Sequence, residues 1–185
     1  FAFIQHMIYQ LADNGTAAVV VPHGALFRGG AEGVIRQYII QQQNYLDAVI
    51  GLPPNLFYGT TIPACILILK KCRVDSDNVL FIDASEEFER IANQNILTDG
   101  HVSKIVAAYE GRKTIQKYAY LAPISEIADN DYNLNISRYV DMFEKEEQVD
   151  IKAVARQLKA LDVDMQTTDK LIAGFCTELG IENPF

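Results

Sequence analysis

The sequence predicts an α/β fold with a mostly parallel sheet and one antiparallel hairpin strand. Short continuous apolar runs, typical of strands buried in a sheet, alternate with segments whose apolar residues recur at helical spacing. The links between these segments are short, which favours one layered domain. The link before the third apolar run is too short for a parallel crossover, so we expect the third strand to run antiparallel to the second.

Residues 1–73 hold the first elements, which we interpret as part of a core sheet. Helical periodicity over residues 1–12 and 31–42 predicts two helices. Apolar runs over residues 16–21, 46–50 and 62–69 predict three strands. The first of these runs does not alternate with polar residues, so we expect it to be covered on both faces.

Residues 74–145 are expected to extend the same domain. The signals here are a short apolar run, capping residues and turn-forming residues. They predict a strand over 79–83, a short helix from Ser85 through Ile91, a helix from Thr98 to Tyr109, a strand over 118–121, a helical turn over 124–128 and a loop over 130–135.

Residues 146–185 are expected to form a helical tail with two amphipathic helices. The helices can dock on the preceding domain or pair with a helix of a partner, and the pattern leaves both alternatives open. The two apolar stripes consist of Ile151, Val154, Ala155, Leu158 and Leu161, and of Leu171, Ile172, Phe175 and Leu179.

Composition and charge restrict the classes of function. The 185 residues are 49% hydrophobic and 22% charged, as in a globular domain with an appendage. No apolar run approaches the ~20 residues of a membrane span, and three cysteines in no paired motif favour a reducing cytoplasm. The net charge is −8, but residues 1–73 hold five basic and three acidic residues. A contact with nucleic acid is therefore expected only locally, within these residues.

Common catalytic and metal-binding patterns are not found in the sequence. His6, His23 and His101 lie far apart without ligand spacing, so we interpret them as structural residues. The sequence contains no Gly-x-Ser-x-Gly elbow and no Walker loop.

Two loops are candidates for ligand contacts. Residues 28–33 (RGGAEG) open a helix, either as an ordinary helix start or as a loop that contacts phosphate with help from Arg28 and Arg36. Residues 52–60 (LPPNLFYGT) follow the second strand, where open α/β sheets bind ligands. There Phe57 and Tyr58 either pack structurally or offer a stacking face to a planar ligand or an extruded base.

Several segments in the same order resemble the modification (methyltransferase) subunit of type I restriction–modification systems. The resemblance covers about residues 1–140, and the tail is similar to the variable helical tail of that family. Its segments are 14–22 (NGTAAVVVP), 26–33 (LFRGGAEG), 49–60 (VIGLPPNLFYGT) with Ile62-Pro63, 81–85 (FIDAS) and 131–140 (DYNLNISRYV).

The resemblance implies the carboxyl-terminal part of a Rossmann-like sheet in an S-adenosylmethionine-dependent DNA methyltransferase that acts on adenine N6. In that family the target adenine is flipped out of double-stranded DNA and receives the methyl group directly from the sulfonium. A specificity subunit chooses the DNA sequence, and a restriction subunit and a second modification subunit can join the complex. A family aromatic that packs on the flipped base corresponds best to Phe57 and next to Tyr58.

The sequence departs from the family at the catalytic and cofactor motifs. The family's Asn/Asp-Pro-Pro-Phe/Tyr motif is absent, because Leu52 precedes the Pro-Pro pair and cannot accept a hydrogen bond from the adenine amino group. We assign no catalytic and no cofactor-binding residue to this chain and expect both motifs upstream of Phe1. The full-length protein is expected to be the enzyme and this chain alone to be inactive.

Two alternatives belong to other functional classes. The chain can serve as a non-catalytic scaffold whose tail binds a specificity subunit. An unrelated nucleotide-binding module is the third reading, and the missing GxGxxG pattern counts against it.

Overall fold

The computed structural model describes residues 1–140 and 151–182, with side chains of the second range from Val154 onward. These two ranges belong to two compact units, which are considered separately. The domain boundary predicted between residues 145 and 146 lies outside the described residues.

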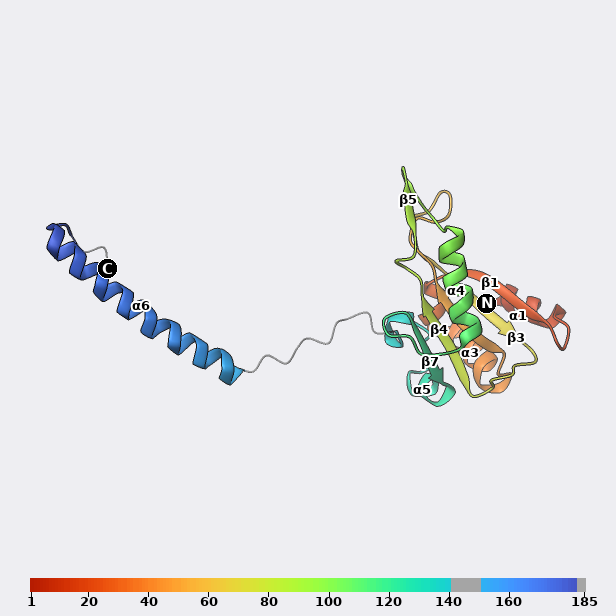
Figure 1. The fold of residues 1–185 in the computed structure, drawn as a ribbon. Helices are drawn as coiled ribbons and strands as arrows, with labels where there is room; N and C mark the ends of the chain where they lie inside the picture. Colours follow the sequence, from red (N-terminus) through yellow and green to blue (C-terminus); the bar gives the residue numbers. More distant parts are fainter. Residues whose placement is uncertain (141–150, 183–185) are drawn as a thin grey trace. The chain divides into compact units, whose positions relative to one another are not determined.

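A five-stranded mixed sheet forms the centre of residues 1–140 (Figure 1). Its strands are β1 (Thr16–Pro22), β2 (Leu46–Gly51), β3 (Ala64–Lys70), β4 (Asn78–Asp83) and β7 (Ala119–Pro123). Their order is β1-β3-β2-β4-β7, and β3 is antiparallel to both of its neighbours, so the expected direction of the third strand is confirmed. β1, β2 and β4 share one direction, but β3 separates β1 from β2, which leaves β2–β4 as the parallel pair in this sheet. The pairs β1–β3, β2–β3 and β4–β7 are antiparallel, so the expectation of a mostly parallel sheet is wrong for these strands. The reason is that β3 and β7 both run against the shared direction of the other three strands.

Helices flank this sheet, and most of them form where the sequence pattern predicted a helix. The pattern over 31–42 forms an α-helix that continues into a π-turn. The elements are α1 (Ala2–Gln10), α2 (Gly24–Phe27), α3 (Gly30–Gln37), η1 (Tyr38–Gln42), α4 (Asp99–Gly111), α5 (Ile124–Asp129) and η2 (Ile136–Arg138).

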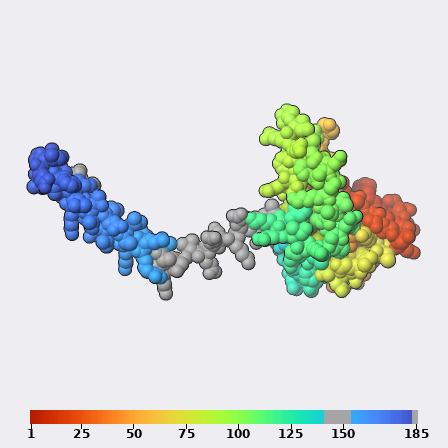
Figure 2. Space-filling view, in the orientation of Figure 1, coloured from red at the N-terminus to blue at the C-terminus, as the bar shows by residue number. Residues whose placement is uncertain are grey.

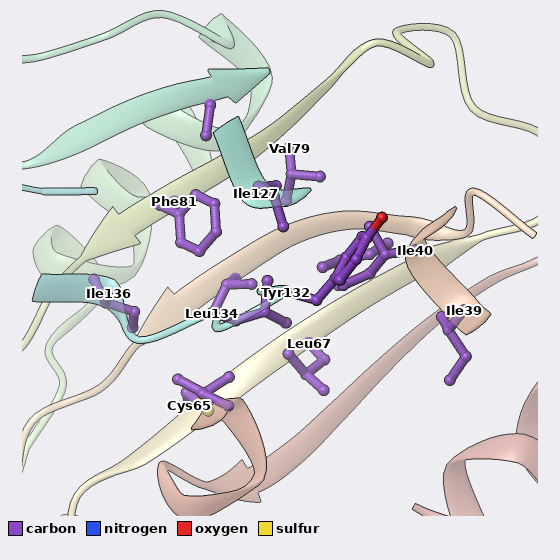
Figure 3. Close-up of a cluster of buried hydrophobic side chains, with 14 of the residues drawn as sticks. Ile39, Ile40, Cys65, Leu67, Val79, Phe81, Ile127, Tyr132, Leu134 and Ile136 are labelled. Carbon is purple, nitrogen blue, oxygen red and sulfur yellow. The ribbon is translucent and has the colours of Figure 1, made fainter. Parts of the chain in front are cut away.

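Two apolar clusters cover the two faces of the sheet. The larger cluster joins β2, β3 and β4 to α1, η1, α5 and the segment around Leu134 (Figure 3). In it Phe81 is fully buried and stacks on Tyr139, with ring centroids 3.9 Å apart. The smaller cluster joins Leu80 and Ile82 of β4 to Ile105 of α4. Burial of these side chains provides the main driving force for folding of this unit.

The expectation that the first strand is covered on both faces is wrong. β1 alternates between exposed and half-buried residues, and Val20 is 53% exposed. Ala17, Val19 and Val21 pack against the larger cluster, whereas the other face of β1 has no covering helix among residues 1–140. The strand also lies at the edge of the sheet, so that one of its sides has no hydrogen-bonded neighbour in the described residues.

The short helix predicted from Ser85 through Ile91 is also wrong. Ser85 N–H donates to Asp83 Oδ1 at 3.0 Å, which makes a turn directly after β4. The chain then forms a hairpin of β5 (Glu89–Ile91) and β6 (Gln94–Ile96). Hydrogen bonds to the loop after β2, which is distant in sequence, hold this hairpin in place. Local periodicity in the sequence does not indicate such hydrogen bonds.

The tail forms one helix instead of the two predicted. α6 spans Ile151–Leu179 without interruption, because residues 162–170 contain no proline and no glycine to stop it. Among the helices of residues 1–140 and 151–182, none has both the length and the apolar character of a bilayer span.

One carboxylate lies inside the sheet, at the amino end of β2. Asp47 is 2% exposed, and the pairing of β2 with β3 shifts register beside it. Three cations surround this carboxylate: Lys70 Nζ at 3.2 Å, Arg73 Nε at 3.5 Å and Arg112 Nη1 at 3.1 Å. Tyr109 OH donates a hydrogen bond to it at 2.7 Å. The cluster joins β2 to the end of β3, to the connection that follows and to α4.

The surroundings of Asp47 stabilise its ionised form. Burial by itself raises the pKa of this carboxyl, but the Tyr109 hydrogen bond and the charges of Arg112 and Lys70 together hold the pKa below its usual value. A depressed pKa in the folded state means that Asp47 contributes its full stability above about pH 4, the ordinary pKa of an aspartate, and loses it as the pH falls through the folded-state pKa.

We expect Asp47→Ala to lower the free energy of unfolding by about 3 kcal/mol, because it removes the carboxylate that pairs with the buried Arg73 side chain and with Lys70. Below pH 4 the unfolding free energy of the wild type should fall, and that of the variant should fall less, because the variant has no carboxylate at position 47 to protonate. Urea unfolding between pH 3 and pH 7 measures both effects. An unchanged unfolding free energy at pH 7 would contradict this prediction.

Candidate functional site

Loop 52–63 leaves the carboxyl end of β2 and returns as β3. Leu52 N–H donates to the Ala64 carbonyl at 2.9 Å, which closes the base of the loop. Asn55 N–H donates to the Thr61 carbonyl at 3.3 Å, which narrows the loop below its tip. Asn55 and Gly59 have positive φ angles of 55° and 76°, so the chain turns sharply on both sides of the tip. The loop therefore projects from the end of the sheet in a defined conformation.

The two aromatic side chains singled out from the sequence lie at the tip of this loop. Phe57 is 42% exposed and Tyr58 is 92% exposed. Phe57 borders two hollows, one of about 260 Å³ at the carboxyl end of β1 and one of about 320 Å³ beside the β5–β6 hairpin. Tyr58 borders the second hollow. Phe57 is thus the aromatic placed between the sheet edge and the hairpin.

The hollow at the end of β1 is lined without any charged side chain. Its lining includes Val20, Phe57, Thr60 and Ile62. This lining suits the flat face of a base. It lacks the carboxylates that would bind the ribose hydroxyls and the amino group of S-adenosylmethionine, so these residues do not fit that cofactor by themselves.

The two arginines expected at DNA phosphates have different environments. Arg36 is 4% exposed, and its guanidinium donates to the carbonyls of Tyr132, Ala25 and Arg28 at 2.7, 3.2 and 2.9 Å. Burial lowers the pKa of Arg36, and the charge of Glu32 partly offsets this. The expectation that Arg36 contacts a DNA phosphate is therefore wrong, because its donors are directed at protein carbonyls. Arg36 has a structural role.

The assignment of Arg28 to a phosphate contact stays a prediction. It is exposed, and it lies between α2 and the start of α3. The glycine-rich segment opens α3 with Gly29 as its N-cap, as the sequence predicted.

The histidines occupy separate structural positions. His23 Nε2 lies 3.2 Å from the Ala64 carbonyl, and His101 Nδ1 accepts a hydrogen bond from Thr98 N–H at the start of α4. Within residues 1–140 and 151–182, no group of three His, Cys, Asp or Glu side chains is arranged to hold a metal ion.

Sequence reasoning missed the residues that support loop 52–63. Gln94 and Asn95 of β6 donate hydrogen bonds to its backbone. The sequence feature that could have indicated these residues is the run of three amide side chains at 93–95 in a short polar segment. The loop and the hairpin project together from one end of the sheet (Figures 1 and 2).

The family described as N-6 DNA Methylase has a sequence model that matches residues 1–148. The chain belongs to this family. Membership of this family rules out the alternative that the chain is an unrelated nucleotide-binding module. Among curated N-6 DNA methylases, the type I restriction enzyme MpnII methylase subunit of Mycoplasma pneumoniae is 39% identical over 165 residues, which is 89% of this chain and 30% of that protein.

Solved structures of type I restriction–modification proteins agree with the observed fold. The type I restriction–modification methyltransferase subunit of Streptococcus thermophilus is 54% identical with a TM-score of 0.73, over 76% of this chain and 30% of that one. The EcoKI M protein has a TM-score of 0.61 at 21% identity, over 90% of this chain and 43% of that one. The predicted α/β fold of a type I methyltransferase subunit is thereby confirmed. The chain spans about 30% of the length of the curated relatives it matches.

We expect Arg36→Met to lower the free energy of unfolding by about 2–4 kcal/mol, because three carbonyls lose their buried donor. Arg28→Met is the matched control. It removes the same group from an exposed position and should change the unfolding free energy by less than about 0.5 kcal/mol. Urea unfolding at neutral pH compares the two variants, and equal effects would refute the structural role of Arg36.

Proposed function

We propose that this chain forms the carboxyl-terminal part of the methyltransferase domain of a type I modification subunit, together with a helical extension. The complete protein would transfer a methyl group from S-adenosylmethionine to adenine N6 in double-stranded DNA. The observation that carries this proposal is the family match across residues 1–148, which includes the loop that holds Phe57 at the end of the sheet.

The exposed edge of β1 supports the division of the active site between this chain and the rest of the subunit. β1 has a free side and an uncovered face, and unpaired strand edges are templates for further strands. The hollow bordered by Phe57 lies at the carboxyl end of β1. A strand added beside β1 and parallel to it would therefore end next to Phe57, where the proposal requires the catalytic motif and the cofactor.

In this proposal Phe57 packs on the flipped adenine, with Tyr58 as a second aromatic at the pocket. Stacking on an aromatic side chain stabilises an extruded base by about 1–3 kcal/mol. Arg28 is the proposed phosphate contact of this chain. The net charge of −8 implies that a specificity subunit supplies much of the affinity for DNA.

The helix α6 is the proposed contact with the specificity subunit. Apolar side chains, with one threonine among them, recur along it at alternating intervals of four and three residues, the pattern of a coiled-coil seam. Most are well exposed, for example Leu158 at 57%, Leu161 at 60% and Phe175 at 60%. The positions are Val154, Leu158, Leu161, Met165, Thr168, Ile172, Phe175 and Leu179.

The same helix favours a second candidate function, that of a non-catalytic scaffold that binds the specificity subunit. An intact catalytic motif elsewhere in the subunit distinguishes the enzyme from the scaffold. The proposed assembly further includes double-stranded DNA, a restriction subunit and a second modification subunit, and the proposed compartment is the cytoplasm.

We expect a full-length modification subunit that contains this sequence, combined with its specificity subunit, to form N6-methyladenine in unmethylated DNA. Phe57→Ala should lower kcat by about 10- to 100-fold through loss of base stacking. Phe3→Ala removes an exposed aromatic from α1 and serves as the control. Mass spectrometry of digested DNA gives the readout. A complex that assembles on DNA without producing methyladenine would favour the scaffold.

We expect Leu161→Asp to weaken assembly with the specificity subunit by at least about 10-fold, because it places a charge in the apolar seam of α6. Ala160→Asp introduces the same charge at the neighbouring exposed position, which lies outside the seam, and should leave assembly unchanged. Titration of labelled subunit measures the dissociation constants. Equal weakening by both variants would contradict a seam-specific contact.

A further inference from the structure

The backbone of loop 52–63 is fixed from outside the loop just before Phe57. Three successive carbonyls of the loop accept hydrogen bonds from two residues of β6. Asn95 Nδ2 donates to the Pro54 carbonyl at 2.7 Å, and Asn95 N–H donates to the Asn55 carbonyl at 3.0 Å. Gln94 Nε2 donates to the Leu56 carbonyl at 2.9 Å. The next residue in the chain is Phe57.

The contact is reciprocal. Asn55 Nδ2 donates back to the Asn93 carbonyl, so that the loop also holds the hairpin. Asn95 is 7% exposed, which makes it one of the few buried polar residues of the described chain. The β5–β6 hairpin has strands of three residues each, and β5 is exposed throughout. An isolated two-stranded hairpin is marginal in water, so the loop and the hairpin stabilise each other.

This arrangement determines where Phe57 stands. The tip of an exposed loop normally samples several backbone conformations, and each would move the aromatic ring. Hydrogen bonds at residues 54, 55 and 56 remove that freedom up to the residue before Phe57. A misplacement of about 1 Å in a positioning group can lower the rate of a reaction by about 100-fold. The hairpin therefore restricts the position of Phe57 in addition to covering the end of the sheet.

We propose that the β5–β6 hairpin is a positioning element for the base pocket, and that Asn95 is its principal positioning residue. Asn95 acts by holding the backbone that presents Phe57 to the flipped adenine, and it is not a catalytic residue. This inference rests on the proposed function, since it requires that Phe57 contacts the target base.

The test uses the full-length modification subunit in complex with its specificity subunit. Asn95→Asp keeps the size of the side chain but replaces the donor that faces the Pro54 carbonyl with an acceptor. Glu89→Gln changes one charge in the same hairpin and serves as the control. Glu89 is exposed, and the side-chain hydrogen bonds from β6 to the loop described above come from Gln94 and Asn95. The DNA duplex carries 2-aminopurine at the target adenine for the fluorescence measurement.

We expect Asn95→Asp to lower kcat by at least about 10-fold while the KM for S-adenosylmethionine and the Kd for DNA change by less than about 2-fold. The 2-aminopurine signal of the complex should shift from the wild-type value toward that of Phe57→Ala. Glu89→Gln should match the wild type in both measurements. If Asn95→Asp fails to fold, Gln94→Met tests the same contact without a buried charge, and we expect a smaller loss of kcat with the same direction of fluorescence change.

The outcomes separate this inference from the proposed function. If the wild-type complex forms no methyladenine, the proposed function itself is wrong. If the wild type is active and Phe57→Ala changes kcat and fluorescence, but Asn95→Asp matches the wild type, the positioning role is overturned. It is also overturned if both hairpin variants lower kcat only in proportion to a loss of DNA affinity.

Discussion

The buried carboxylate of Asp47 constrains the rest of the sheet. A charge at 2% exposure is tolerated only when partners surround it, and here they come from β3, from the connection after β3 and from α4. These contacts set the position of β2 relative to β3 and of α4 relative to both strands. The strands that carry the functional loop are thus fixed at the ends remote from that loop.

The opposite end of the same strands is held in a different way. Loop 52–63 and the β5–β6 hairpin are joined by amide and backbone hydrogen bonds, with Asn95 buried between them. Neutral hydrogen bonds of this kind hold a conformation without placing a fixed charge beside Phe57, and both hollows that Phe57 borders are lined by uncharged residues. The molecule thereby separates a charged end at Asp47 from an uncharged end that exposes Phe57 and Tyr58.

The described residues expose several surfaces that are apolar or lack a hydrogen-bonded neighbour. The free edge of β1, the uncovered Val20 and the apolar seam of α6 are surfaces that are normally buried in a complete protein or complex. An acidic net charge also disfavours independent binding to DNA. These features agree with a chain that spans about 30% of its curated relatives.

The sequence by itself determined the elements that depend on local patterns. Helical periodicity found α1 and the helical segment of α3 and η1, and capping and turn residues found α4. Apolar runs found β1 to β4, and the short link before β3 predicted its direction. The aromatic pair at 57–58 could be singled out because it follows a buried strand. Tertiary structure alone decided the residues whose partners are distant in sequence. Arg36 became buried because three carbonyls surround it, and residues 85–91 formed a turn and a strand because Gln94 and Asn95 hold the hairpin to the loop after β2. Periodicity reports which face of an element is apolar, whereas hydrogen-bond partners that lie far apart in sequence are set only when the chain is folded.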